Sequence, residues 1–127
     1  MSTSIESRCG SYLDAWSRKD IEGVAALIHP DVHFKAPMQE FDGRDAYITA
    51  TTRVFPLLKR LDVRAQFVSG NHAVLIYDFV CSPPIDVSRT AELVTFKDGL
   101  IRETELFFDA RPFEAMQKAL ANKPTLK

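Results

Sequence analysis

The sequence predicts one α+β domain in which helices cover one face of a curved sheet. Two patterns support this prediction. Apolar residues recur at three- and four-residue spacing through most of the first 55 residues, which is typical of helices. From residue 62 to residue 109 they recur at every second position, as in strands with one buried face. The length of 127 residues fits a single domain with a sizeable core.

The first helix is predicted to begin at a capping box and to run to about Ser17. The segment TSIE matches that motif, in which Thr3 and Glu6 would satisfy the first free backbone amides. An apolar stripe at helical spacing follows it: Ile5, Cys9, Tyr12, Leu13 and Trp16. We expect this stripe to face the interior.

A second helix and a strand are predicted next. Asp20 is expected to cap the helix, and Pro30 to end it. The segment VHFKAP at residues 32–37 predicts a strand, because its apolar residues alternate with His33 and Lys35. The apolar row of this strand is expected to face a pocket; it consists of Val32, Phe34 and Ala36.

The remaining elements are one helix, four strands and a closing helix. A turn at Asp42 and Gly43 leads into the third helix, which Pro56 should end or kink. Four strands separated by turn residues are predicted at 62–69, 72–81, 89–97 and 100–109. A short helix from Pro112 to about residue 121 closes the chain.

Composition excludes some classes of partner. The formal net charge is −1, so the chain lacks the positive field that nucleic acids or anionic membranes require. No apolar run approaches the length of a membrane span, and the N-terminus has no apolar signal core. Cys9 and Cys81 are far apart and lie in apolar segments. They predict two buried free thiols in a reducing compartment, and therefore a cytoplasmic protein.

Three stretches support a resemblance to a known superfamily: YLDAWSRKDIEGVAALIHPDVHFKAP, FDGRDAYI and TFKDGLIRETELFFD. With the order of elements, they resemble the nuclear-transport-factor-2-like (NTF2-like) superfamily from about Tyr12 to Phe113. Its members include ketosteroid isomerases, SnoaL-like polyketide cyclases, limonene-epoxide hydrolases, scytalone dehydratases and many non-catalytic binding domains. The resemblance implies a cone, in which a curved sheet wraps the first helix and leaves a pocket open at one end.

The resemblance to ketosteroid isomerases assigns expected roles to four positions. The tyrosine that donates to a substrate oxyanion falls on Tyr12, and the hydrogen-bonding aspartate beside it falls on Glu92. The aromatic residue that lines the pocket from the last strand falls on Phe108. The general-base aspartate falls on Ala36, and a methyl group cannot accept a proton. Steroid-type isomerisation through that position is therefore not expected.

Glu92 is the strongest candidate for a catalytic residue. In TAELVTF, strand alternation places it on an apolar row with Val94. Burial of an ionised carboxylate is costly, so its pKa should rise unless a cation pairs with it. A raised carboxyl group could act as an acid or a base. Alternatively, Glu92 lies at the rim of the cone, or it orders the core by a hydrogen bond to Tyr12.

Asp78 is a second candidate carboxylate. If Val74 and Ile76 face the pocket, Asp78 faces it too, and the pair with Glu92 could divide acid and base roles. A salt bridge from Asp78 to Arg89 or Arg102 on a neighbouring strand is the alternative. The other row of this strand is also apolar, which predicts that the outer face of the sheet is covered in a homodimer.

Two functions remain open at this stage. One is a cofactor-free isomerase, cyclase or dehydratase that acts on a small hydrophobic molecule by proton transfer, with Glu92, Tyr12 and Asp78 as catalytic groups. The other is a non-catalytic dimer that binds an apolar ligand or a protein. No metal site is expected, and the pocket wall is expected to comprise Trp16, Phe34, Ala36, Val74, Ile76, Val94, Leu106 and Phe108.

Overall fold

The computed structural model describes residues 4–121. Its helices are α1 (Ile5–Ser17), α2 (Ile21–Ala25), α3 (Arg44–Val54), the 3₁₀ turn η1 (Phe55–Leu57) and α4 (Arg111–Ala121). Its strands are β1 (Ile28–Ala36), β2 (Gln39–Asp42), β3 (Leu58–Ser69), β4 (His72–Cys81), β5 (Val87–Lys97) and β6 (Leu100–Phe107). The predicted α+β class is confirmed.

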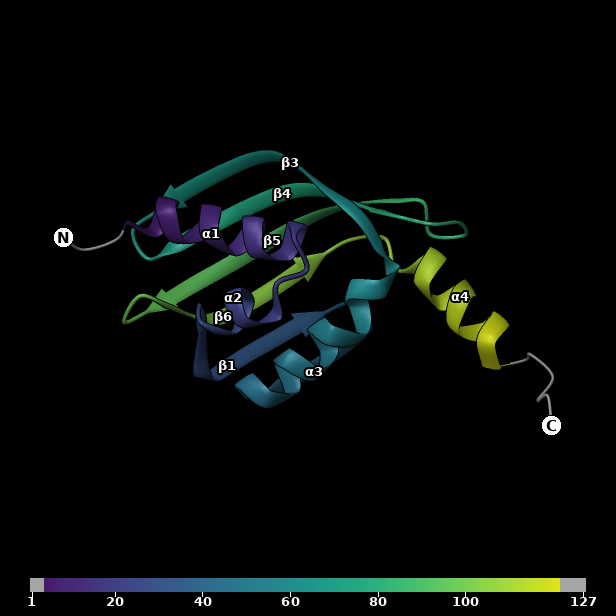
Figure 1. Cartoon of the computed structure of the whole chain (residues 1–127), viewed down its shortest axis with the longest axis horizontal. Coiled ribbons are helices and arrows are strands. Elements are labelled where there is room, and N and C mark those ends of the chain that lie inside the picture. The colour runs from purple at the N-terminus through teal and green to yellow at the C-terminus, as the bar shows by residue number, and fades with distance from the viewer. Residues whose placement is uncertain (1–3, 122–127) are drawn as a thin grey trace.

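All six strands belong to one curved sheet, in the order β2-β1-β6-β5-β4-β3. β1 runs parallel to β6, and the other neighbours are antiparallel. The first three helices lie along one face of this sheet, whereas α4 extends beyond its edge (Figure 1). The concave face and α1 therefore enclose the interior.

The two N-terminal helices differ in detail from the prediction. Ser4 rather than Thr3 caps α1, because the Ser4 side chain accepts from the Ser7 amide; Thr3 lies outside the described residues. Asp20 caps α2 as predicted, but α2 ends at Ala25. Pro30 instead lies in β1, where the pairing with β6 shifts register and a missing amide is tolerated.

The strand β2 was not predicted. It pairs with β1, and its Phe41 ring stacks on Phe34 with the ring centroids 4.7 Å apart. On the opposite face, the His33 imidazole contacts the carboxylates of Asp42 and Glu40 at 2.7 and 2.8 Å. Both carboxylates raise the pKa of His33. These contacts hold β2 at the rim of the sheet.

The core forms where α1 packs on the sheet. The predicted stripe of α1 is buried at Cys9, Tyr12 and Leu13. Cys9 and Cys81 are buried and free, as the sequence predicts. Each helix within residues 4–121 is too short or too polar to span a bilayer.

The faces of β4 are the reverse of those predicted. Leu75 and Tyr77 are buried on the concave side, whereas Val74, Ile76 and Asp78 lie on the outer face. The pairing explains this arrangement, since residues directly opposite each other in an antiparallel ladder share a face. Tyr77 lies opposite Thr90, and Asp78 lies opposite Arg89.

Candidate active site

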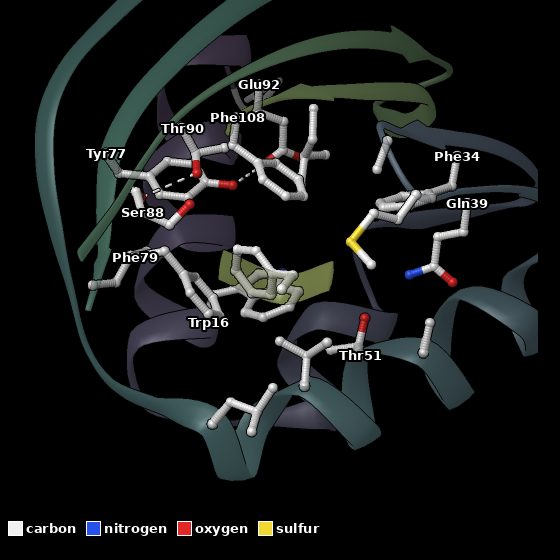
Figure 2. A pocket seen from close by; sticks show the side chains of 18 of the residues that line it. Trp16, Phe34, Gln39, Thr51, Tyr77, Phe79, Ser88, Thr90, Glu92 and Phe108 are labelled. Carbon is white, nitrogen blue, oxygen red and sulfur yellow. Dashed lines mark hydrogen bonds between the residues drawn. The ribbon is translucent and has the colours of Figure 1, made fainter. Parts of the chain in front are cut away.

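A cavity of about 270 Å³ lies between α1, α3 and the concave face of the sheet. Its wall is mainly aromatic and aliphatic, and side chains from the strands and helices surround an open space (Figure 2). Phe34 and Gln39 face Trp16 and Phe79 across it (Figure 2). The helix α4 contributes Phe113, Met116 and Gln117.

Glu92 provides the carboxylate of this cavity, and its exposed fraction is 2%. The phenol of Tyr12 donates to Glu92 Oε2 at 2.8 Å, and the phenol of Tyr77 donates to Oε1 at 2.8 Å. The hydroxyl of Thr104 also donates to Oε2. Three protein hydroxyls from α1, β4 and β6 therefore converge on one carboxyl group.

A chain of hydrogen bonds extends from this group to the cavity wall. The phenols of Tyr12 and Tyr47 are 2.6 Å apart. Because the single hydroxyl hydrogen of Tyr12 is directed at Glu92, Tyr47 is the donor in this contact. The indole Nε1 of Trp16 donates in turn to Tyr47 at 3.4 Å. Each hydrogen bond in this series is therefore donated toward Glu92.

Burial dominates the acid–base properties of the site. It raises the pKa of Glu92, although the hydroxyls of Thr104, Tyr77 and Tyr12 oppose the shift by stabilising the carboxylate. Burial and the negative charge of Glu92 also raise the pKa of each phenol around it. Burial thus favours the protonated form of Glu92 and the neutral form of each phenol.

Most of the predicted site residues do line this cavity. The structure places Tyr12, Trp16, Phe34, Ala36, Glu92, Leu106 and Phe108 in its wall. Val94 is fully buried on the same row of β5 as Glu92, but it belongs to the core and does not reach the cavity.

The prediction that Asp78, Val74 and Ile76 face the pocket is wrong, because all three lie on the outer face. Asp78 pairs there with Arg89 Nε at 2.8 Å and with Arg64 at 3.1 Å. Hydrogen bonds from Arg89 lower the pKa of Asp78 below its ordinary value. Asp78 therefore has the alternative role, a salt bridge, and no carboxylate pair forms with Glu92.

Three members of the network were not identified from the sequence. Tyr47 is a buried residue of α3, and nothing in the local sequence indicates that its phenol contacts Tyr12. Tyr77 belongs to the second apolar row of β4, for which the sequence predicts the outer face. Thr104 is a polar residue at a buried position of β6 with 1% exposure, which is the pattern of a satisfied internal hydroxyl.

The chain belongs to the SnoaL-like domain family, because the model of that family matches residues 10–104. The expected membership of the NTF2-like superfamily is confirmed. No curated protein sequence matches the chain.

Solved structures show the same fold. A protein from Kribbella flavida superimposes with a TM-score of 0.82 at 26% identity, over 91% of this chain and 95% of that chain. An NTF2-like protein from Cytophaga hutchinsonii superimposes with a TM-score of 0.78 at 19% identity, over 90% of this chain and 97% of that chain. A steroid delta-isomerase from Pseudomonas aeruginosa superimposes with a TM-score of 0.75 at 20% identity, over 95% of this chain and 94% of that chain. These likenesses confirm the cone-shaped fold.

Proposed function

We propose that the protein binds one small apolar molecule in the cone and transfers a proton to or from it through Glu92, without a cofactor. The observation that supports this most directly is a buried carboxyl group with a raised pKa in the wall of an apolar cavity. The reaction would be an isomerisation, a cyclisation or a dehydration. The fold similarity to a steroid delta-isomerase agrees with this class.

Tyr12 would support the reaction rather than perform the proton transfer. Its phenol donates to Glu92 and accepts from Tyr47, so it fixes the carboxyl group and stabilises its ionised form. Ala36 lines the same cavity but has no titratable atom. Glu92 must therefore act as both acid and base, unlike a pair of carboxylates that divide these roles.

The proposal is tested with two substrates that fit the cavity. We expect the wild type to accelerate either deuterium exchange at the α-carbon of 2-indanone or loss of water from 1-indanol to give indene. Glu92→Gln should lower that rate by about 10²–10⁴-fold, because the proton-transfer group is lost. NMR measures both reactions. Glu103→Gln, on the exposed side of β6, is the charge-matched control, and equal rates in wild type and Glu92→Gln would contradict the enzyme proposal.

A non-catalytic binding protein is the second candidate. One observation favours it: among the described residues, every buried polar side-chain atom already has a hydrogen-bond partner. A fully satisfied network can simply order the core and orient a ligand. In that case a ligand would bind in the cavity with no turnover. The buried free thiols agree with the cytoplasmic location expected for either function.

We also propose that the outer face of the sheet is the interface of a homodimer. Apolar side chains adjoin one another across four strands of this face: Phe67, Val74, Ile76, Ala91, Leu93 and Phe107. Phe67 and Phe107 are 62% and 51% exposed. A second copy of the chain would cover these side chains by presenting the same patch across a two-fold axis.

A charge in the middle of this patch should separate the two copies. We expect Phe107→Glu to convert a dimer into a monomer, because the new carboxylate would be buried without a partner. Sedimentation velocity of both proteins over a range of concentrations measures the change. Leu120→Glu is the control, because Leu120 is also a largely exposed apolar residue but lies on α4. A wild type that sediments as a monomer throughout would remove the dimer proposal.

A further inference from the structure

The residues that line the cavity can supply negative charge but no positive charge. Among the described residues that line it there is no lysine, arginine or histidine, and Glu92 is the sole carboxylate. None of the ion pairs within residues 4–121 includes Glu92. A buried carboxylate without a cation is costly, and its ionised form is favoured strongly by a positive charge nearby. The protein does not supply that charge.

The directions of the hydrogen bonds point to the same kind of ligand. The hydroxyl hydrogens of Tyr12, Tyr77 and Thr104 are all directed at Glu92, and that of Tyr47 is directed at Tyr12. With Glu92 ionised, this network has no hydrogen left to donate to a ligand. An ionised carboxylate has about four acceptor positions, and three are occupied. The unoccupied one is on Oε1, which accepts only from Tyr77.

The walls of the cavity suit a cation as well. Trp16, Phe34, Phe79 and Phe108 present ring faces and edges to the open space (Figure 2). Trp16 is held edge-on by Phe79, with the ring centroids 6.3 Å apart. Aromatic faces attract ammonium groups, most strongly where water is excluded. An anion would meet a carboxylate and the negative faces of these rings.

We infer that the cavity takes a small amine in its protonated form, with the ammonium group on Oε1 of Glu92 and a compact apolar ring between the aromatic walls. This inference rests on the proposed binding cavity but not on turnover. The cavity has room for roughly nine water volumes, which corresponds to a bicyclic molecule of about the same number of non-hydrogen atoms. A positive charge that develops during a dehydration would be stabilised by the same groups.

Binding of an ammonium ion should change the protonation of Glu92. The groups that face Glu92 are Tyr12 and Cys9 from α1, Tyr47 from α3 and Tyr77 from β4, and all of them are neutral with raised pKa values. Glu92 is therefore the group of this set that titrates. Because burial raises its pKa, the ammonium ion lowers that pKa on binding and releases a proton from the molecules in which Glu92 is protonated.

The test uses four molecules with one ring system: 1-aminoindane, 1-indanol, 1-indanone and indane-1-carboxylate. Calorimetry in two buffers of different ionisation enthalpy gives the affinity and the number of protons released. Emission from Trp16, the chain's one tryptophan, reports occupancy of the cavity independently. We expect the amine to bind at least about 30-fold more tightly than the ketone, with proton release, because a buried charge pair contributes that much. The carboxylate should not bind.

Substitution of Glu92 by glutamine removes the charge of the cavity and nearly preserves its shape, so it tests which of the two selects the ligand. Glu92→Gln should lower the affinity for 1-aminoindane by at least about 30-fold and change the affinity for 1-indanol by no more than a few-fold. Glu103→Gln, which removes a charge of the same sign from outside the cavity, should change neither. If Glu92→Gln does not fold, proton release by the wild type decides the question instead.

Three results would overturn the inference. They are a ketone or carboxylate that binds as tightly as the amine, an amine affinity that does not depend on Glu92, and no saturable amine binding below about 1 mM. Tight amine binding without any turnover of 2-indanone or 1-indanol would leave the inference standing and remove the enzyme proposal. Turnover of either substrate without a preference for the amine would remove the inference and leave the enzyme proposal standing.

Discussion

Glu92→Gln is expected to make the protein more stable above pH 7 and to remove a fall in stability that the wild type shows as pH rises. The folded-state pKa of Glu92 is raised above its ordinary value of 4.5, chiefly by burial. The folded protein therefore holds a proton that the unfolded chain releases. The contribution of Glu92 to stability is full below pH 4.5 and is lost as pH rises through the folded-state pKa.

The size of this effect follows from linkage. Between the two pKa values the free energy of unfolding should fall by about 1.4 kcal/mol for each pH unit. A glutamine is neutral at every pH and has nearly the same shape, so the variant should lack this slope. Urea denaturation from pH 4.5 to pH 9 measures it for both proteins.

The difference between the two proteins is the informative quantity. His33 also has a raised pKa, and its contribution to stability is lost as pH rises above 6.5, but this happens equally in wild type and variant. Glu103→Gln provides a second comparison for the loss of one negative charge. A wild-type curve parallel to that of Glu92→Gln over the whole range would show that the folded-state pKa of Glu92 is not raised, contrary to the prediction.

Ala36→Asp is expected to increase deuterium exchange at the α-carbon of 2-indanone by about 10²–10⁴-fold over the wild-type rate. Ala36 lines the same cavity as Glu92 and lies at the end of β1. A carboxylate there would supply the general base that the resemblance to ketosteroid isomerases expects at this position. The variant should be less stable at neutral pH, because the cavity would then contain two carboxylates and no cation.

The matched control for this gain is Ala36→Asn. Its side chain has nearly the same size and polarity as aspartate but cannot accept a proton from carbon. NMR at several pH values should show that exchange by Ala36→Asp rises with ionisation of the new carboxyl group. Equal exchange by the two variants would mean that position 36 does not reach the α-carbon of the ketone.

The residues of β5 and β4 show what could and could not be predicted from the sequence. In β5 one row is apolar around Glu92 and the other is mixed, so alternation alone placed Glu92 in the interior. In β4 both rows are apolar, and the choice between them depends on the register with β5. The turn at 82–86 sets that register, and its geometry is not readable from alternation.

The network around Glu92 was only partly predictable for a related reason. Tyr12 was identified because it lies on the helical stripe and matches a family position. Tyr77 and Thr104 come from β4 and β6, and their contacts with Glu92 exist only once these strands are aligned on β5. Hydrogen bonds between distant elements depend on this alignment, whereas a helical stripe depends on local spacing.

The spacing of these partners along the chain determines when the site can exist. Tyr12 and Glu92 are 80 positions apart, and β1 must pair in parallel with β6 to complete the open sheet. Such distant contacts form slowly compared with local ones, since the chain must close a long loop first. During synthesis, α1 leaves the ribosome long before its carboxyl partner has been made. Capacity to bind a ligand should therefore return in the last step of refolding.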